Sequence, residues 1–205
     1  MLSVFKGFAI ALIIVAGGTT SGCIMYREGQ LPPIMQWPPD VKQTKPTISL
    51  IVTGQFTRNG SVREGSDDYY YEEWPRDTFR AYQDSGLFSA VRQTAVDSDL
   101  RAEIRILDNT ESSPVMSFIT GLTLSLIPSR VTETMTVKTT LKDRNGATLR
   151  SFEKSESLTT WVELFLAFAM PFRSMDDHLS VYDLNRATIL EAHSSKGLLL
   201  EASSR

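Results

Sequence analysis

The feature that most constrains the fold is an alternation of apolar and polar residues from 131 to 143, followed by the pair Asn145-Gly146. One face of this stretch carries four apolar side chains: Val131, Met135, Val137 and Leu141. The other face is polar: Thr132, Thr134, Thr136, Lys138 and Thr140. Asn-Gly favours a tight hairpin turn, and residues 147–153 can return as the second strand. We therefore expect an antiparallel hairpin whose polar face meets solvent or a polar partner.

Further elements are indicated on both sides of the hairpin. Residues 47–56 are apolar and β-branched, which is typical of a buried strand, and residues 100–109 alternate as a half-buried strand does. Residues 87–95 are a candidate short strand. One helix is expected to begin near Pro75, since proline suits the first turn, and another to run from Asp176 to His193. The pattern predicts an α+β domain over residues 47–205, a single domain with a mostly antiparallel sheet of about four to five strands and helices packed on one side.

Composition limits the classes of function. The 205 residues carry a net charge of −3, with 22% charged residues, and this length suits one domain with its own core. A protein that binds a polyanion needs a basic face, and none is evident here. We expect no nucleic-acid partner.

The N-terminal segment differs from the rest of the chain. Residues 8–18 read FAIALIIVAGG, a run as long as the apolar region of a signal peptide and too short to span a bilayer as a helix. Small residues follow and lead into Cys23, the only cysteine. A secretory signal, or an N-terminal membrane helix with an incidental cysteine, would also fit this pattern.

Ser21, Gly22 and Cys23 resemble the lipobox of bacterial lipoproteins, with Thr20 standing where leucine is usual. The resemblance implies a signal peptide over residues 1–22, cleavage between Gly22 and Cys23, and a lipid anchor (diacylglyceryl and palmitate chains) on Cys23. Ile24, in place of an aspartate, implies the outer membrane of a diderm bacterium, with the chain facing the periplasm. In another kind of bacterium the anchor would lie on the extracytoplasmic face of the cell membrane.

Residues 23–46 are expected to form a tether behind the lipidated cysteine. They hold five of the nine prolines, and paired prolines favour an extended polyproline conformation. Ile34, Met35 and Trp37 are costly to leave in water, so we expect part of the tether to be a semi-extended arm that packs on the domain or on a partner.

Two apolar segments, 115–129 and 161–172, allow three interpretations. Both could be core helices beneath the sheet, an apolar patch in the membrane interface, or a docking patch for a protein partner. Neither is long enough to span a bilayer as a helix. The residues that would make a membrane or partner contact are Phe118, Leu122, Leu126, Trp161, Phe165 and Phe168.

No constellation for catalysis or metal binding is evident. The two histidines, His178 and His193, would be about 22 Å apart on one helix, too far to share a metal. Ser151 and Lys154 match S-x-x-K, but they fall on an expected strand, whereas that motif needs a helix start. We expect no catalytic residue, no metal site and no cofactor.

An acidic and aromatic cluster over residues 67–74 is the most unusual polar feature. Asp68, Tyr70, Glu73 and Trp74 could form a surface that stacks on a glycan or binds a cation. The alternative is a helix N-terminus that carries its favourable acidic charge. Asp97 and Asp99 match only the start of a calcium loop, which lacks its glycine and final glutamate here.

The function predicted from these features is a lipid-anchored cell-envelope protein. It would be a non-catalytic accessory or assembly component that acts at the membrane surface, with an envelope protein as partner. The alternative is a periplasmic lipoprotein that binds a glycan or cation through the cluster at residues 67–74.

Overall fold

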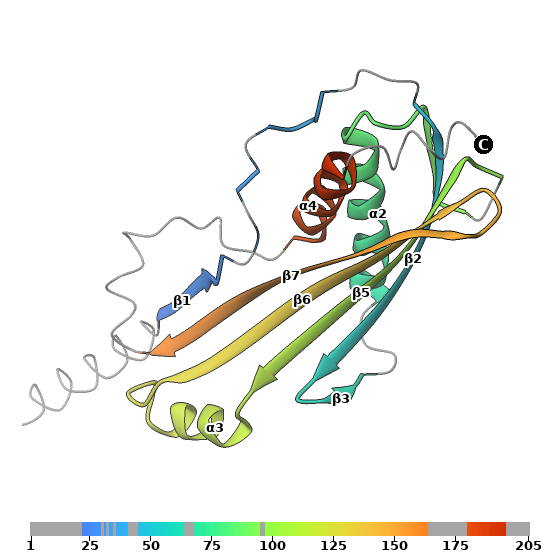
Figure 1. Cartoon of the computed structure of the whole chain (residues 1–205). Coiled ribbons are helices and arrows are strands. Elements are labelled where there is room, and N and C mark those ends of the chain that lie inside the picture. The colour runs from blue at the N-terminus through green and yellow to red at the C-terminus, as the bar shows by residue number, and fades with distance from the viewer. Residues whose placement is uncertain are drawn as a thin grey trace, which may run out of the picture. The chain divides into compact units, whose positions relative to one another are not determined.

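The chain is an α+β protein, with seven strands and three helices in the part that the structure describes. The computed structural model describes residues 22–29, 31, 33–34, 36–40, 45–63, 68–94, 97–163 and 180–195. The strands are β1 (Gly22–Arg27), β2 (Thr47–Arg58), β3 (Ser61–Val62), β4 (Ala90–Arg92), β5 (Leu100–Ser112), β6 (Ser129–Asp143) and β7 (Thr148–Glu163). The helices are α2 (Asp68–Asp84), α3 (Pro114–Leu122) and α4 (Val181–Ser194) (Figure 1).

The strands form one mixed sheet in the order β1-β7-β6-β5-β2-β3, with β4 also pairing with β2. β2 runs parallel to β4 and β5, whereas β1 is antiparallel to β7 and β3 to β2. The parallel pairing of β2 with β5 is possible because α2 provides the crossover between them. The α+β class is confirmed. The sheet is larger than the four to five strands predicted and contains parallel neighbours.

The chain divides into two compact units. Unit 1 comprises residues 1–27, 111–132 and 158–178, and unit 2 comprises residues 28–110, 133–157 and 179–205. The α3 connection and the β1–β7 pairing belong to unit 1. The helices α2 and α4 belong to unit 2.

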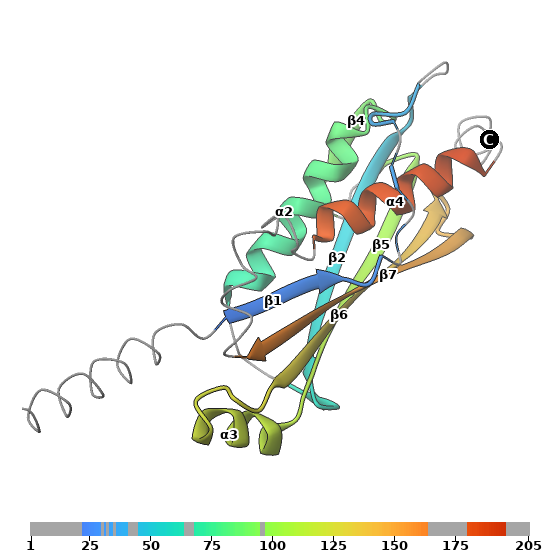
Figure 2. The same ribbon diagram turned by 90° about the vertical axis from the view of Figure 1, so that its left-hand side faces the viewer.

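Unit 2 holds the hydrophobic core. α2 and α4 cover one face of its sheet, as Figures 1 and 2 both show. The largest fully buried apolar side chains come from the strands and from α4: Ile48, Leu50, Leu100, Ile104, Ile106, Val137 and Leu184. Asn185 on α4 donates a hydrogen bond of 3.2 Å to Thr78 on α2, which satisfies two polar groups beneath the helices.

The opposite face of the β6–β7 hairpin is a ladder of polar pairs. Thr134 contacts Ser157 at 3.0 Å, and Thr136 contacts Ser155 at 3.0 Å. Lys138 pairs with Glu153 at 3.2 Å in the same register. The predicted hairpin and its polar face are confirmed, since these hydroxyls and charges face one another across neighbouring strands.

The segment predicted as a tether is partly a strand. Residues 22–27 form β1 and pair with β7, because β7 offers a free edge that an extended segment can complete. Farther along, Leu31 and Trp37 pack against the core, and Arg186 lies over the Trp37 ring at 5.1 Å. The described part of this segment is therefore a docked arm rather than a free spacer.

Two boundaries differ from the prediction. α2 begins at Asp68, so Pro75 lies inside the helix rather than in its first turn. A proline there leaves the carbonyl of residue 71 without its usual donor. β7 extends to Glu163 and so includes Trp161, the start of the second apolar segment, as strand rather than helix. α4 begins at Val181, and the earlier part of its predicted range lies outside the described residues.

Candidate functional site

Cys23 lies on the edge strand of unit 1. It pairs with Val162 of β7, and its side chain is exposed and makes no disulfide. β7 is in turn paired with β6, where the hydroxyls of Thr132 and Thr159 meet at 3.2 Å. This register places Ser129, the first residue of β6, beside Val162. Cys23, Val162 and Ser129 thus form one row across three strands, which spans about 10 Å at the usual strand spacing.

The connection from β5 to β6 ends beside this row. We call residues 113–128 the apolar loop; it contains α3 and the turn that follows it. Figures 1 and 2 both place α3 at the end of the sheet where β1 begins. The exposed apolar side chains of the loop are Val115, Met116, Phe118, Leu122, Leu124, Leu126 and Ile127. Phe118 is 68% exposed and Leu122 is 69% exposed, so the interpretation of this segment as a core helix is wrong.

The local sequence explains why a helix forms here. Ser113 caps the helix by accepting a hydrogen bond from the Met116 backbone N–H, and Pro114 occupies the first helical position. Thr120 is 4% exposed and lies on the opposite side of the helix from Phe118 and Leu122. Leu124 and Ser125 take positive φ angles of 49° and 65°, where the chain turns back toward β6.

Hydroxyl groups in the apolar loop bind the loop's own backbone. Ser117 donates to the Ser113 carbonyl at 3.0 Å, Thr120 to the Met116 carbonyl at 2.8 Å, and Thr123 to the Ile119 carbonyl at 2.8 Å. The Ile127 N–H donates to the Thr123 hydroxyl at 3.2 Å. These polar groups are satisfied without water, so removing water from around them costs little.

The other residues predicted for this contact are placed differently. Trp161 is half-buried on β7, opposite Ile24 of β1. Phe165 and Phe168 lie outside the described residues. Phe118, Leu122 and Leu126 are the predicted contact residues that lie in the apolar loop with exposed side chains.

The acidic and aromatic cluster falls on the first half of α2. Trp74 is 5% exposed and belongs to the hydrophobic core, so it cannot stack on a ligand at the surface. Glu73 pairs with Arg76 at 3.0 Å within the helix. Asp68 and Tyr70 begin the helix, and their side chains lie outside the described residues. An acidic start suits a helix N-terminus.

A buried carboxyl pair in unit 2 was missed by the sequence analysis. Asp108 on β5 is 2% exposed, and its Oδ1 atom has no hydrogen-bond partner among the described residues. Burial, and then the charge of the neighbouring Glu133 carboxyl, raises the pKa of Asp108 to about 7. Burial also raises the pKa of Glu133. The pair is therefore expected to retain a proton near neutral pH.

The alternation of buried and exposed positions along β5 and β6 could have revealed this pair. Asp108 continues the even-numbered, buried series of Leu100, Ala102, Ile104 and Ile106. Glu133 lies on the face of Met135 and Val137. Because successive side chains of a strand point to opposite faces, both carboxyls could have been assigned to the face of the sheet that the helices cover.

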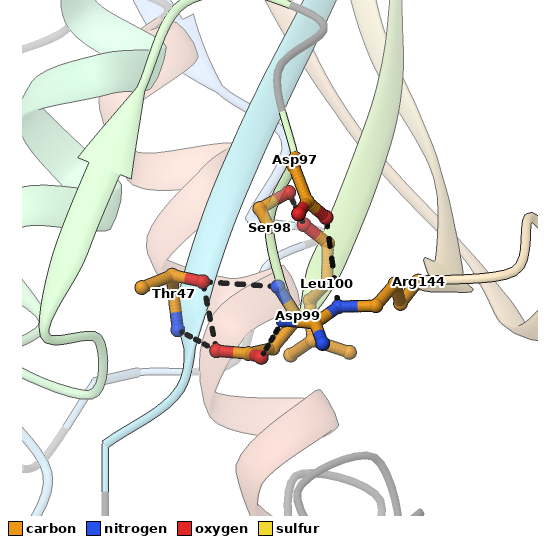
Figure 3. A network of polar contacts seen from close by, with 6 residues as sticks. All are labelled: Thr47, Asp97, Ser98, Asp99, Leu100 and Arg144. Atoms are coloured by element: carbon orange, nitrogen blue, oxygen red, sulfur yellow. Dashed lines mark hydrogen bonds and ion pairs between the residues drawn. The ribbon is translucent and has the colours of Figure 1, made fainter.

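A second polar network joins three elements of unit 2 (Figure 3). The Asp99 carboxylate accepts hydrogen bonds from the Thr47 backbone N–H at 2.9 Å and from the Thr47 hydroxyl at 2.7 Å. Arg144, in the β6–β7 turn, reaches Asp99 at 2.9 Å and Asp97 at 3.5 Å. The bonds from Thr47 and the charge of Arg144 lower the pKa of Asp99. Asp97 and Asp99 are thus used to tie the starts of β2 and β5 to the turn.

His193 lies in the last turn of α4, and His178 lies outside the described residues. Over the described ranges, no group of three or more histidine, cysteine, aspartate or glutamate side chains could hold a metal ion. The helices that the structure describes include none long and apolar enough to cross a membrane.

Comparisons with known proteins give distant structural similarity. No family model and no curated protein matches the chain. It is similar to a neuraminyllactose-binding hemagglutinin homologue from Helicobacter pylori, with 10% identity, a TM-score of 0.42, and coverage of 82% of this chain and 94% of that one. It is also similar to a PelC variant from Paraburkholderia phytofirmans, a dodecamer, with 11% identity, a TM-score of 0.29, and coverage of 81% and 96%. Both TM-scores are below 0.5, so these similarities assign no function to this chain.

Proposed function

We propose that the chain is a lipid-anchored protein of the bacterial cell envelope, held to the membrane through acylated Cys23. It acts as a non-catalytic accessory or assembly component at the membrane surface, with an envelope protein as its partner. Ile24 after the anchor favours the periplasmic side of the outer membrane.

The observation that carries this proposal is the place of Cys23 in the fold. Its side chain is exposed on the edge strand of unit 1, where a modifying enzyme and a lipid leaflet can both reach it. Cleavage after Gly22 would leave the acylated residue as the first residue of β1. Two or three acyl chains are enough to hold a folded domain stably on a membrane, because each buried CH₂ group contributes about 0.8 kcal/mol.

Exposed apolar side chains support an interaction role. Contiguous apolar surface on a water-facing protein usually marks a site of contact with a protein or a membrane. The seven exposed apolar side chains of the apolar loop lie in the same unit as Cys23.

The test is metabolic labelling with an alkyne-bearing fatty acid during expression in a diderm bacterium. The wild-type chain should take up the label, lose residues 1–22, and sediment with outer-membrane vesicles in a density gradient. The Cys23→Ser variant should take up no label. A wild-type chain that remains unlabelled and soluble in the periplasm would contradict the proposal.

A further inference from the structure

We propose that the apolar loop, residues 113–128, inserts into the same lipid leaflet that receives the acyl chains of Cys23. The protein then contacts the bilayer at two neighbouring points and is held in a fixed orientation. This inference rests on the proposed lipid anchor, and it adds a second membrane contact and names its ligand as the lipid surface.

The first support is the chemistry of the loop surface. Residues 112–129 contain no charged side chain, and the nearest charges are Glu111 and Arg130 on the flanking strands. Val115, Phe118 and Leu122 are spaced so that they share one side of α3, and each is more than 60% exposed. A helix with one exposed apolar side is suited to lie in a membrane interface.

The second support is the pairing of the loop's polar groups. The hydroxyls of Ser117, Thr120 and Thr123 each donate to a carbonyl one turn earlier in the same segment. The helix cap and the turn use backbone donors of the loop in the same way. A segment that enters an apolar phase needs such internal pairing, because lipid tails offer no hydrogen bonds.

The third support is the distance to the anchor. The row of Cys23, Val162 and Ser129 places the end of the loop about 10 Å from the acylated residue. α3 has nine residues and is about 14 Å long, so it is too short to cross a bilayer. It is long enough to lie among the headgroups and upper acyl chains beside the anchor.

A lipid surface fits this patch better than a protein groove. A specific protein interface carries about one hydrogen bond per 100–200 Å². The hydroxyls that α3 could offer for such bonds are already bound to its own backbone. A bilayer needs no specific polar contacts and accepts the apolar side chains alone.

The test uses the acylated full-length mature protein in vesicles of phosphatidylethanolamine and phosphatidylglycerol. Acylation blocks Cys23, the only native cysteine, so an engineered cysteine is the single free thiol. Phe118→Cys carries an environment-sensitive fluorophore. Asn145→Cys, in the exposed β6–β7 turn of unit 2, carries the same label as the control.

On vesicles, the label at position 118 should shift its emission to the blue. Lipids with a quencher on the acyl chain should quench it at least about threefold more than the label at position 145. Leu122→Asp in the labelled chain should reduce this quenching, since a charge opposes insertion.

Three results would overturn the inference. If the protein floats but the label at position 118 keeps the emission of a label in water, the loop is outside the bilayer. The lipid anchor would still be supported. A blue shift without quenching by lipid would assign the loop to a protein contact. If the protein does not float at all, neither the lipid anchor nor the apolar loop binds the membrane.

Discussion

Cys23 and Ser129 lie in the same row of the sheet, with Val162 of β7 between them. The proposed acylation site and the end of the apolar loop are therefore joined by backbone hydrogen bonds across two strand spacings. A lipid on Cys23 would be attached to the sheet itself, because residues 22–27 are paired with β7 rather than extended as a spacer. With the proposed acyl chains on Cys23, this geometry would hold the exposed apolar side chains close to the membrane.

The buried carboxyl pair makes stability depend on pH. The pKa of Asp108 is raised to about 7 in the folded chain, from 3.8 for a free carboxyl. The folded state thus retains a proton that the unfolded state releases, so the free energy of unfolding falls as pH rises from about 4 to about 7. Asp108→Asn should weaken this dependence and raise the free energy of unfolding at pH 8 by about 2 kcal/mol, measured by urea denaturation.

The control for this prediction is Asp40→Asn, the same change at an exposed site. If Asp108→Asn lowered stability equally at pH 5 and pH 8, the charge of Asp108 would be favourable in the fold. The account of the pair would then be wrong.

The network at Asp99 changes the free energy of unfolding with pH in the opposite direction. Its lowered pKa stabilises the folded chain at pH values above about 4, and this stabilisation is lost as pH falls through the folded-state pKa. Asp99→Ala should reduce the free energy of unfolding by about 1–2 kcal/mol at pH 7, because it removes the hydrogen bonds from Thr47 and Arg144. Asp97→Ala is the matched control, since the Asp97 side chain is 85% exposed and pairs with Arg144 at 3.5 Å. Equal losses for the two variants would show that the bonds to Thr47 contribute nothing.

The docked arm depends on Trp37. Its ring packs on the core and lies beneath the Arg186 guanidinium at 5.1 Å, while the Leu31 N–H reaches the Glu156 carboxylate at 3.3 Å. Trp37→Ala should release the arm and increase the rate of amide hydrogen exchange at Leu31 about tenfold. Gln36→Ala, at the exposed neighbouring position, should leave the rate unchanged. Unchanged exchange at Leu31 in the Trp37 variant would mean that the arm is held by other contacts.

The sequence predicted those elements whose pattern is local. The β6–β7 hairpin was found because Met135, Val137 and Leu141 alternate with polar residues and Asn145-Gly146 fixes the turn. The strands β2 and β5 were found from their apolar runs. Helix starts were less certain, as α2 shows, because a proline inside a helix resembles a proline at its first turn.

What could not be predicted depends on contacts between distant residues. β1 becomes a strand because the edge of β7 is free, and nothing within residues 22–27 reveals this. The apolar loop has the composition of a core segment, so only its place at the end of the sheet shows that Phe118 and Leu122 are exposed. Trp74 was ambiguous for the same reason, and packing places it in the core.

The most direct measurement is vesicle flotation of three forms of the chain: acylated wild type, Cys23→Ala, and Cys23→Ala with Phe118→Asp and Leu122→Asp. Asn145→Asp in the Cys23→Ala chain controls for added negative charge at an exposed turn. The account predicts that wild type floats fully, and that Cys23→Ala and its Asn145→Asp derivative float in part. The form with two aspartates in the apolar loop should remain at the bottom of the gradient. If Cys23→Ala with its loop intact also remained at the bottom, the loop would not bind the membrane, and the two-point contact would be wrong.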